Sequence, residues 1–287
     1  MSAAPIQLLI VVGGHPYDHG AFMAIFDADS GIEATPVEQP AAQERLRPEN
    51  AAAYDAVLFY DLSGIAPPSV AGPTRAGDLP SPPDDYRRSI EALLARGTGL
   101  LLLNHGLLSW PGWPLWRALS GTAFLLRQGE LAGQRLPGSG FRGGATEPAR
   151  NVKTQLRAEA PGHPVLAGLE AGFAIRDELY LKSRDFESEV LPLLRSDYDF
   201  VAENFSPPPL APRSEREQWT HPPGSDLVVW AKAAGRSPVV ASELGDGPDA
   251  YANAGFRRLL GNAVRWVASA EARAWAGVQA RGPSSPR

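Results

Sequence analysis

Short apolar runs alternate along this chain with segments whose apolar residues recur at helical spacing. Three runs are apolar at every position, namely residues 8–12, 56–60 and 100–103. Strands that are apolar on both faces are typical of a parallel sheet covered by helices on both sides. In residues 21–27 and 84–96 the apolar positions recur every three or four residues, as they do on one helix face. We therefore expect an α/β fold in which the ends of these three strands lie side by side.

The remaining pattern fills out a single domain. Further strands are predicted at residues 32–37, 151–156 (at a sheet edge), 177–181 and 189–194, a hairpin joins 227–231 to 237–242, and an amphipathic helix covers 251–268. Residues 66–83 are rich in Pro and Gly and predict a long surface loop, a candidate lid. We assign residues 1–270 to one α/β domain and 271–287 to a C-terminal tail, with disorder expected from residue 282.

Polar residues stand directly after two of the central strands. Asn104, His105 and Gly106 follow the run of four leucines, and Asp61 follows the 56–60 strand. Parallel strands end at one sheet edge, where open α/β folds bind ligands. Gly106 tolerates a positive φ, so we expect it to permit the sharp turn that presents His105. His105 is therefore a candidate functional residue, and the alternative is that it caps the following helix.

Two more histidines follow the first strand. His15 and His19 are four residues apart, a spacing that suits metal ligands on one helix face. Pro16 and the neighbouring glycines favour a loop instead, and local hydrogen bonding of each imidazole is the plainer interpretation.

Acidic and aromatic residues supply further candidates. Asp177 and Glu178 lie inside an alternating, strand-like segment, where carboxylates are either paired or functional if buried. The alternative is an edge strand with solvated acids. Trp110 and Trp113 offer faces that suit the apolar faces of sugars, or they pack under a loop.

Composition narrows the function classes. The chain has 287 residues, a net charge of −5 and no cysteine. The net negative charge argues against nucleic-acid binding. Because the sequence contains no cysteine, disulfides, thiolate metal sites and cysteine nucleophiles are excluded. No apolar run is long enough to span a membrane. The apolar N-terminal stretch is interpreted as a strand rather than a signal peptide, so we expect a cytoplasmic protein.

Several short motifs, in this order and spacing, resemble the trehalose-utilization (ThuA-like) family. They lie at residues 11–15, 54–61, 103–105, 119–124, 163–164, 177–180 and 264–267. The resemblance covers residues 6 to 268 and implies the class I glutamine amidotransferase-like fold, a flavodoxin-like three-layer sandwich with a mostly parallel central sheet. It also implies a role in sugar metabolism.

Two departures bear on chemistry. True amidotransferases carry cysteine at the elbow where His105 stands here, so we expect no glutaminase activity. The family usually shows Leu-Gly-His near the last strand, where this chain has Leu244, Gly245 and Asp246.

Three functions remain open at this stage. The first is a sugar-processing protein in which His105 acts as acid or base, with Glu178 as its partner and Asp61 also catalytic. The second is a non-catalytic sugar-binding or complex-forming protein on the same scaffold. The third is a metal-dependent hydrolase, although no HExxH motif is present; its ligands would be among His15, His19, His105, His163 and Glu178.

We expect the ligand to be a small sugar or polyol rather than a nucleotide, because no phosphate-binding fingerprint is present. The main hypothesis includes no metal. The sequence indicates no particular cofactor, and it is compatible with a homo-oligomer. The expected substrate-binding residues are His15, Tyr17, His19, Asn104, Trp110, Trp113, His163, Asp177, Tyr180 and Glu243.

Overall fold

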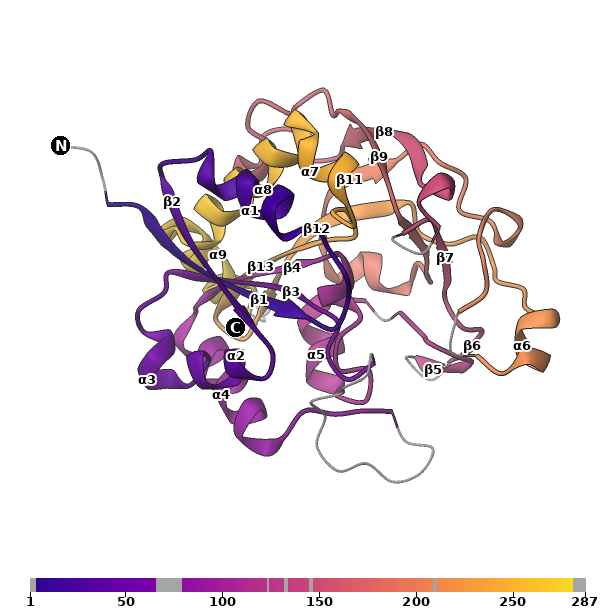
Figure 1. Cartoon of the computed structure of the whole chain (residues 1–287), viewed down its shortest axis with the longest axis horizontal. Helices are drawn as coiled ribbons and strands as arrows, with labels where there is room; N and C mark the ends of the chain where they lie inside the picture. Colours follow the sequence, from indigo (N-terminus) through magenta and orange to yellow (C-terminus); the bar gives the residue numbers. More distant parts are fainter. Residues whose placement is uncertain are drawn as a thin grey trace, which may run out of the picture.

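Nine strands of the described chain form one mixed sheet (Figure 1). The computed structural model describes residues 4–65, 79–122, 124–131, 134–144, 147–208 and 211–280. In sheet order the strands are β2 (Ile32–Glu38), β1 (Ile6–Gly13), β3 (Ala56–Asp61), β4 (Gly99–Leu103), β13 (Ser237–Ser242), β12 (Leu227–Ala234), β11 (Leu191–Ser196), β8 (Val152–Ala158) and β9 (Ala174–Asp177). Two small two-stranded sheets pair β7 (Gly140–Arg142) with β10 (Leu179–Leu181) and β5 (Gly129–Leu131) with β6 (Gln134–Leu136).

The first half of the large sheet is parallel. Strands β2, β1, β3, β4 and β13 all run in the same direction, with Ile10 beside Leu58 and Leu58 beside Leu101. The expected neighbourhood of the three all-apolar strands is therefore confirmed, and their carboxyl ends share one edge. From β13 onward, through β12, β11, β8 and β9, each pair is antiparallel.

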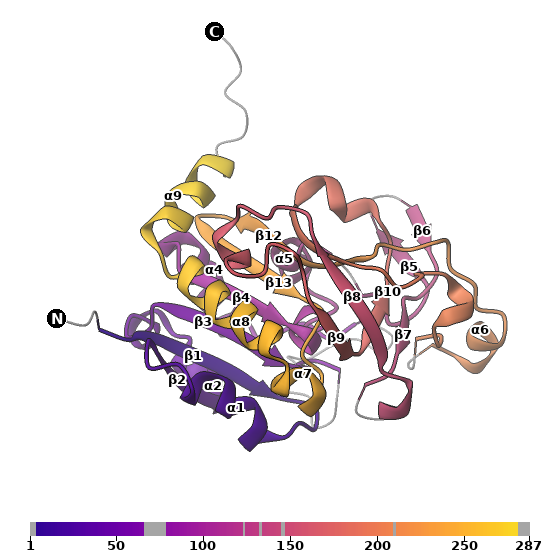
Figure 2. The same cartoon turned by 90° about the horizontal axis from the view of Figure 1, so that it is seen from above.

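Helices cover the parallel half on both faces, as Figures 1 and 2 show. Alternate residues of β1 point to opposite sides. Leu8 and Ile10 join one core cluster with α1, α7 and α8, whereas Leu9 and Val11 join a second with α2, α3, α4 and α5. The helix bounds are α1 (His19–Asp27), α2 (Ala41–Arg45), α3 (Pro48–Ala51), α4 (Asp84–Arg96), α5 (Pro114–Ser120), α6 (Arg213–Glu217), α7 (Pro248–Ala252), α8 (Ala254–Val267) and α9 (Ala270–Gln279). This three-layer arrangement is a flavodoxin-like α/β fold.

Two sequence expectations differ from the structure. The strand expected at an edge is β8, which lies between β11 and β9, so the edge position belongs to β9. Strand β9 pairs with the outer edge of β8, and the alternate β8 residues Val152, Thr154 and Leu156 are buried. Helix α9 occupies most of the segment expected to be a tail, and it packs against β12 and β13.

Other expectations fall outside the described residues. The structure does not describe residues 66–78, which make up most of the candidate lid, or residues 281–287, for which disorder was expected. Within the described part of the chain, no helix is long and apolar enough to cross a membrane.

Candidate active site at the carboxyl edge of the sheet

A tight turn after β4 places His105 at the sheet edge. The chain passes from Leu103 directly into a 3₁₀ turn, Asn104–Leu107, and Asn104 adopts a left-handed backbone with φ 48°. The expectation that Gly106 supplies a positive φ is wrong, because the left-handed residue is Asn104. Gly106 is needed for another reason. A Cβ on it would lie 2.2 Å from the carbonyl oxygen of Phe59 in β3.

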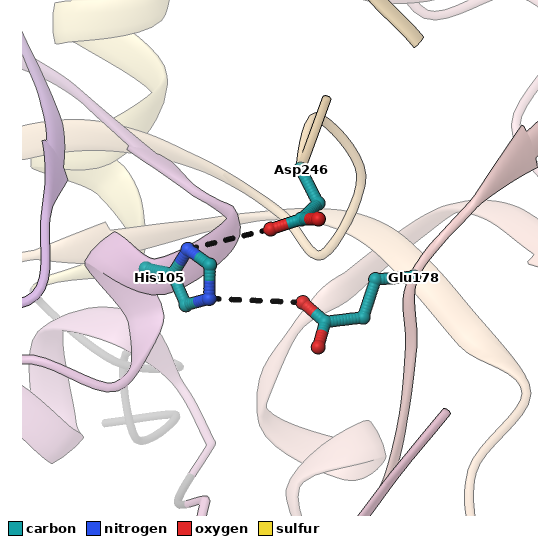
Figure 3. Close-up of side chains that lie close together, drawn as sticks. All are labelled: His105, Glu178 and Asp246. Carbon is teal, nitrogen blue, oxygen red and sulfur yellow. Dashed lines mark ion pairs between the residues drawn. The ribbon is translucent and has the colours of Figure 1, made fainter. Parts of the chain in front are cut away.

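Two carboxyl groups face the His105 imidazole from different elements (Figure 3). Its Nε2 lies 3.7 Å from Oε2 of Glu178, between β9 and β10, and its Nδ1 lies 3.7 Å from Oδ1 of Asp246, in the loop after β13. The side chains of Glu178 and Asp246 are 7% and 2% exposed, and that of His105 is 16% exposed. Residues far apart in the sequence therefore form a buried trio, His105, Glu178 and Asp246.

Burial sets the protonation of these groups. Burial lowers the pKa of His105 well below its ordinary value, and the nearby His15 ring lowers it further. Burial raises the pKa of Glu178 well above its ordinary value, and the neighbouring Asp246 adds to the rise. Both shifts favour the uncharged forms, a neutral imidazole on His105 and a protonated carboxyl group on Glu178.

A hydrogen-bond network behind the trio fixes Glu178. The Tyr180 hydroxyl donates to Glu178 Oε2 at 2.7 Å. The Asn104 amide donates to the carbonyl of Glu243 at 2.8 Å and to the Tyr180 hydroxyl at 3.1 Å. Glu243 itself forms a fully buried ion pair with Lys182, and burial raises the Glu243 pKa to about 7 although Lys182 lowers it.

Asp177 holds the loop that carries Asp246. Its carboxylate accepts hydrogen bonds from the backbone N–H groups of Gly245 at 2.6 Å and of Asp246 at 3.2 Å. Burial raises the Asp177 pKa to about 7 in spite of these bonds. Asp177 is thus a buried support for the loop, and of the two interpretations left open by the sequence, buried carboxyl groups or solvated edge acids, the structure has the buried one at Asp177 and Glu178.

A pocket of about 280 Å³ opens beside the trio and is called the inner pocket below. Polar groups of His15, His105, Glu178 and Tyr180 contribute to one part of its wall. The rest is largely apolar, and its lining includes Leu62, Leu108, Phe124, Leu126 and Phe141. Small-molecule sites commonly combine such apolar walls with a few placed polar groups.

Some expected site residues meet here. The His15 ring lies 4.4 Å from the His105 ring, centroid to centroid, and its Nε2 is 2.7 Å from the Tyr60 carbonyl oxygen. Tyr17 packs beside His15, with ring centroids 5.7 Å apart. The structure thus brings together the members of this group: His15, Tyr17, Asn104, His105, Asp177, Glu178, Tyr180 and Glu243.

The structure places the other expected residues elsewhere. Asp61 turns to Ser63 and Gln39, and burial raises its pKa to about 6. Trp110 and Trp113 are buried in the core, where both pack near Tyr86.

Two histidines also lie apart from the inner pocket. The Nδ1 of His163 accepts a hydrogen bond from the Val165 N–H, so His163 caps a 3₁₀ turn. His19 begins α1 and contacts the Tyr17 hydroxyl. Neither lines the inner pocket.

Sequence reasoning missed three site residues. In the sequence, Asp246 stands out only as a departure from the family's usual histidine, although it follows a buried strand as Asp61 does. No sequence pattern marks Lys182 or Gly144, because their roles depend on contacts with Glu243 and Glu178, which are distant in the sequence or not in a shared motif. A Cβ on Gly144 would lie 2.6 Å from Glu178 Oε1, so this glycine leaves room for the carboxyl group.

The trio also has the residue types of a metal site. One ligand atom from each of its members lies within 4.8 Å of the others. However, opposite nitrogens of the imidazole face the two carboxyl groups, and one imidazole nitrogen binds a given metal ion. The arrangement therefore suits an imidazole held between two carboxyl groups better than a single ion.

Comparison with known proteins identifies the family. The model for the family described as "ThuA: Trehalose utilisation" matches residues 10–267. A ThuA-like protein from Parabacteroides merdae superposes with a TM-score of 0.62 at 15% identity, over 92% of this chain and 90% of that one. A ThuA-like protein from Bacteroides uniformis gives 0.58 at 17% identity, over 93% of each chain. No curated protein matches the sequence. The match over nearly the whole chain shows that this protein belongs to the ThuA trehalose-utilisation family.

Proposed function

We propose that the protein binds an uncharged sugar or polyol in the inner pocket and acts on it by proton transfer. The observation that carries the proposal is the pairing of His105 with Glu178 at the pocket wall, their nearest N and O atoms 3.7 Å apart. Burial favours the neutral form of the imidazole, which is a base, and the protonated form of the carboxyl group, which is an acid. Groups whose environments drive their pKa values apart in this way are typical acid and base partners.

The hydrogen bonds give each oxygen of Glu178 a role. Oε2 accepts from the Tyr180 hydroxyl, so the carboxyl proton belongs on Oε1. Oε1 is the oxygen beside Gly144, which lines the pocket. His105 would take a proton from a bound hydroxyl group, and Glu178 would return one from Oε1.

The pocket wall supports a sugar ligand. Sugar rings have apolar faces and polar edges, and the inner pocket sets aromatic Phe124 and Phe141 alongside the polar groups of His105 and Glu178. The family description, trehalose utilisation, points to the same class of compound.

A saccharide panel tests the proposal. Thermal shift with monosaccharides, disaccharides, polyols and nucleotides identifies ligands, and NMR then follows the best ligand for turnover. We expect stabilisation by a saccharide and turnover that the Glu178→Gln variant loses. Stabilisation by nucleotides alone would contradict the proposal, and binding without turnover would favour the non-catalytic alternative.

Glutaminase activity is excluded from the proposal, because His105 stands where amidotransferases carry their nucleophilic cysteine and the chain has no cysteine. Ammonia release from glutamine above the buffer blank would contradict this.

A metal-dependent hydrolase is the second candidate. Its support is the trio, whose ligand atoms lie within 4.8 Å of one another. Elemental analysis of the purified protein, followed by zinc and manganese titration of the wild type and Asp246→Asn, tests it. Stoichiometric metal that the variant loses would establish this candidate in place of metal-free proton transfer.

A further inference from the structure

Asp246 is the member of the trio to which the proposed proton transfer gives no part. Its side chain is 2% exposed, and its Oδ1 lies 3.7 Å from Nδ1 of His105. Glu178 faces the other ring nitrogen, Nε2, and Figure 3 shows the two carboxyl groups directed at different nitrogens of the ring. Each nitrogen of the imidazole therefore has its own carboxyl group.

The two carboxyl groups also differ in their relation to the inner pocket. His105 and Glu178 line this pocket, whereas Asp246 is not among the described residues that do so. Nε2 is thus the ring nitrogen that faces a group of the pocket wall. Asp246 acts on a ligand in this pocket through His105 rather than by contact.

Buried hydrogen bonds fix the loop that carries Asp246. The Asp177 carboxylate accepts from the backbone N–H groups of Gly245 and Asp246, and the Gly245 carbonyl accepts from the Tyr60 hydroxyl at 2.7 Å. A Cβ on Gly245 would lie 2.9 Å from the Phe256 ring of helix α8, so the loop also lies close against that helix. The position of the Asp246 carboxyl group is therefore set by the interior of the protein.

A neutral imidazole carries its proton on one nitrogen, and the groups that face the two nitrogens decide which one. Nδ1 of His105 is buried and forms no hydrogen bond within the described structure, and Asp246 is the carboxyl group that faces it. An N–H directed at a carboxylate is attractive, whereas a nitrogen lone pair directed at it is repulsive. Asp246 also favours the protonated form of Glu178, whose pKa it helps to raise. Both flanking groups therefore favour an N–H on the side of Asp246 and a lone pair on the side of Glu178.

We propose that Asp246 is a positioning residue that holds the His105 proton on Nδ1 and so leaves Nε2 as the nitrogen that acts as base. This inference rests on the proposed function, in which His105 takes a proton from a bound hydroxyl group. In that step the O–H bond breaks, an Nε2–H bond forms, and the electron pair stays on the substrate oxygen. The ring becomes an imidazolium with a proton on each nitrogen, and the Asp246 carboxylate stabilises its positive charge. A shift of about 1 Å brings Nδ1 and Oδ1 to hydrogen-bond distance.

Nitrogen NMR of protein labelled with ¹⁵N-histidine tests the tautomer without a substrate. A protonated ring nitrogen and one with a lone pair give well-separated signals, and His105→Gln identifies the signals of His105 by their loss. We expect wild-type His105 to have a protonated Nδ1 and an unprotonated Nε2 near neutral pH. Asp246→Asn has nearly the same shape but no charge, and its amide can donate to Nδ1, so this variant should lose the preference.

Two further variants serve as comparisons. Asp249→Asn is the matched control, because Asp249 pairs with Arg176 and not with His105, so the His105 signals should not change. Glu178→Gln should keep the proton on Nδ1, since Asp246 remains in place. A switch of tautomer in Glu178→Gln would assign control to Glu178 and contradict the proposal.

Kinetics give a second readout with the saccharide that the panel identifies. Asp246→Asn should lower kcat at least about 100-fold, as loss of the correct tautomer does in other histidine bases. KM should stay close to that of the wild type, because Asp246 does not line the inner pocket. Asp249→Asn should match the wild type in both constants.

The outcomes separate this inference from the proposed function. A proton on Nε2 of wild-type His105, an imidazolium, or an unchanged tautomer in folded Asp246→Asn would overturn the role of Asp246, whether or not a saccharide is turned over. A proton on Nδ1 that Asp246→Asn loses, without turnover of any saccharide, would support that role and refute the proposed function. If Asp246→Asn does not fold, the tautomers of the wild type and Glu178→Gln decide.

Discussion

His105 is held in place by its neighbours rather than by hydrogen bonds of its own in the described structure. It lies within 4 Å of two carboxyl groups, yet both separations exceed hydrogen-bond length. Such geometry is common in sites that tighten when a substrate binds. The side chain is therefore expected to contribute more to chemistry than to folding.

We expect His105→Ala to keep the fold and to lower turnover of the sugar found in the panel by at least about 100-fold. The imidazole lies at a pocket wall, so its loss removes little core packing. Circular dichroism and a melting curve check the fold, and steady-state kinetics check activity. The control is His221→Ala, since His221 does not line the inner pocket. Normal turnover by His105→Ala would contradict its role.

Asn104 combines a backbone role with a side-chain role, and two substitutions separate them. Both glycine and alanine remove the side-chain amide. Glycine adopts the left-handed φ of 48° without strain, whereas alanine in that conformation costs about 1 kcal/mol or more. We expect both variants to lose activity, because the amide donates to Tyr180 and to the Glu243 carbonyl.

Stability should distinguish these two variants. In chemical denaturation Asn104→Ala should be the less stable by about 1–2 kcal/mol. Full activity in Asn104→Gly would show that the amide is not needed and that only the backbone conformation matters.

At the scale of elements, the contact between β3 and the turn after β4 determines where His105 lies. Gly106→Ala would place a Cβ 2.2 Å from the Phe59 carbonyl oxygen, so the turn must move away from β3. We expect a loss of about 1–3 kcal/mol in unfolding free energy and a marked fall in activity. Denaturant melts and kinetics check both.

The matched change is Gly277→Ala, in helix α9, where the added Cβ meets no atom within 4 Å. Alanine favours a helix over glycine, so this variant should be as stable as the wild type or more so. Equal stability of Gly106→Ala and the wild type would contradict the steric argument.

The parallel half of the sheet was predictable because its signal is local. Each of the strands β1, β3 and β4 contains a continuous apolar run, and the end of the run locates the polar residues that follow it. His105 could be singled out on this basis. The same reasoning also singled out Asp61, but a strand end does not determine where the side chain turns, and that of Asp61 turns to Ser63 and Gln39.

The two carboxyl groups that face His105 were less predictable. Glu178 and Asp246 approach His105 from a break between two strands and from a loop, and no local periodicity encodes where these segments meet. For Trp110 and Trp113 the sequence left open a sugar-binding face or packing under a loop, and the structure buries both side chains, with 0% and 6% exposed.

For the whole molecule, buried carboxyl groups link stability to pH. Asp61 is fully buried and its pKa is raised from 3.8 to about 6, with burial as the main cause. The folded state therefore holds a proton that the unfolded state releases between pH 4 and 6. This contribution to stability is complete below pH 4, falls as the pH rises through that window, and is lost above about pH 6.

We expect Asp61→Asn to remove this dependence. Its unfolding free energy should fall less than that of the wild type between pH 4 and pH 7, by up to about 3 kcal/mol. Urea denaturation at several pH values measures the difference. Parallel curves for the two proteins would show that Asp61 does not titrate in this window.

The pairing of β4 with β13 has a consequence for how the chain folds. Leu100 and Leu103, near the start of the second hundred residues, pair with Val239 and Ser242 near the end of the chain. During synthesis, the leucine-rich strand β4 cannot pair with β13 until most of the chain has left the ribosome. Contacts of such long sequence separation slow folding and leave hydrophobic edges open to aggregation. The strand that positions His105 is therefore also one whose apolar edge favours aggregation until β13 pairs with it.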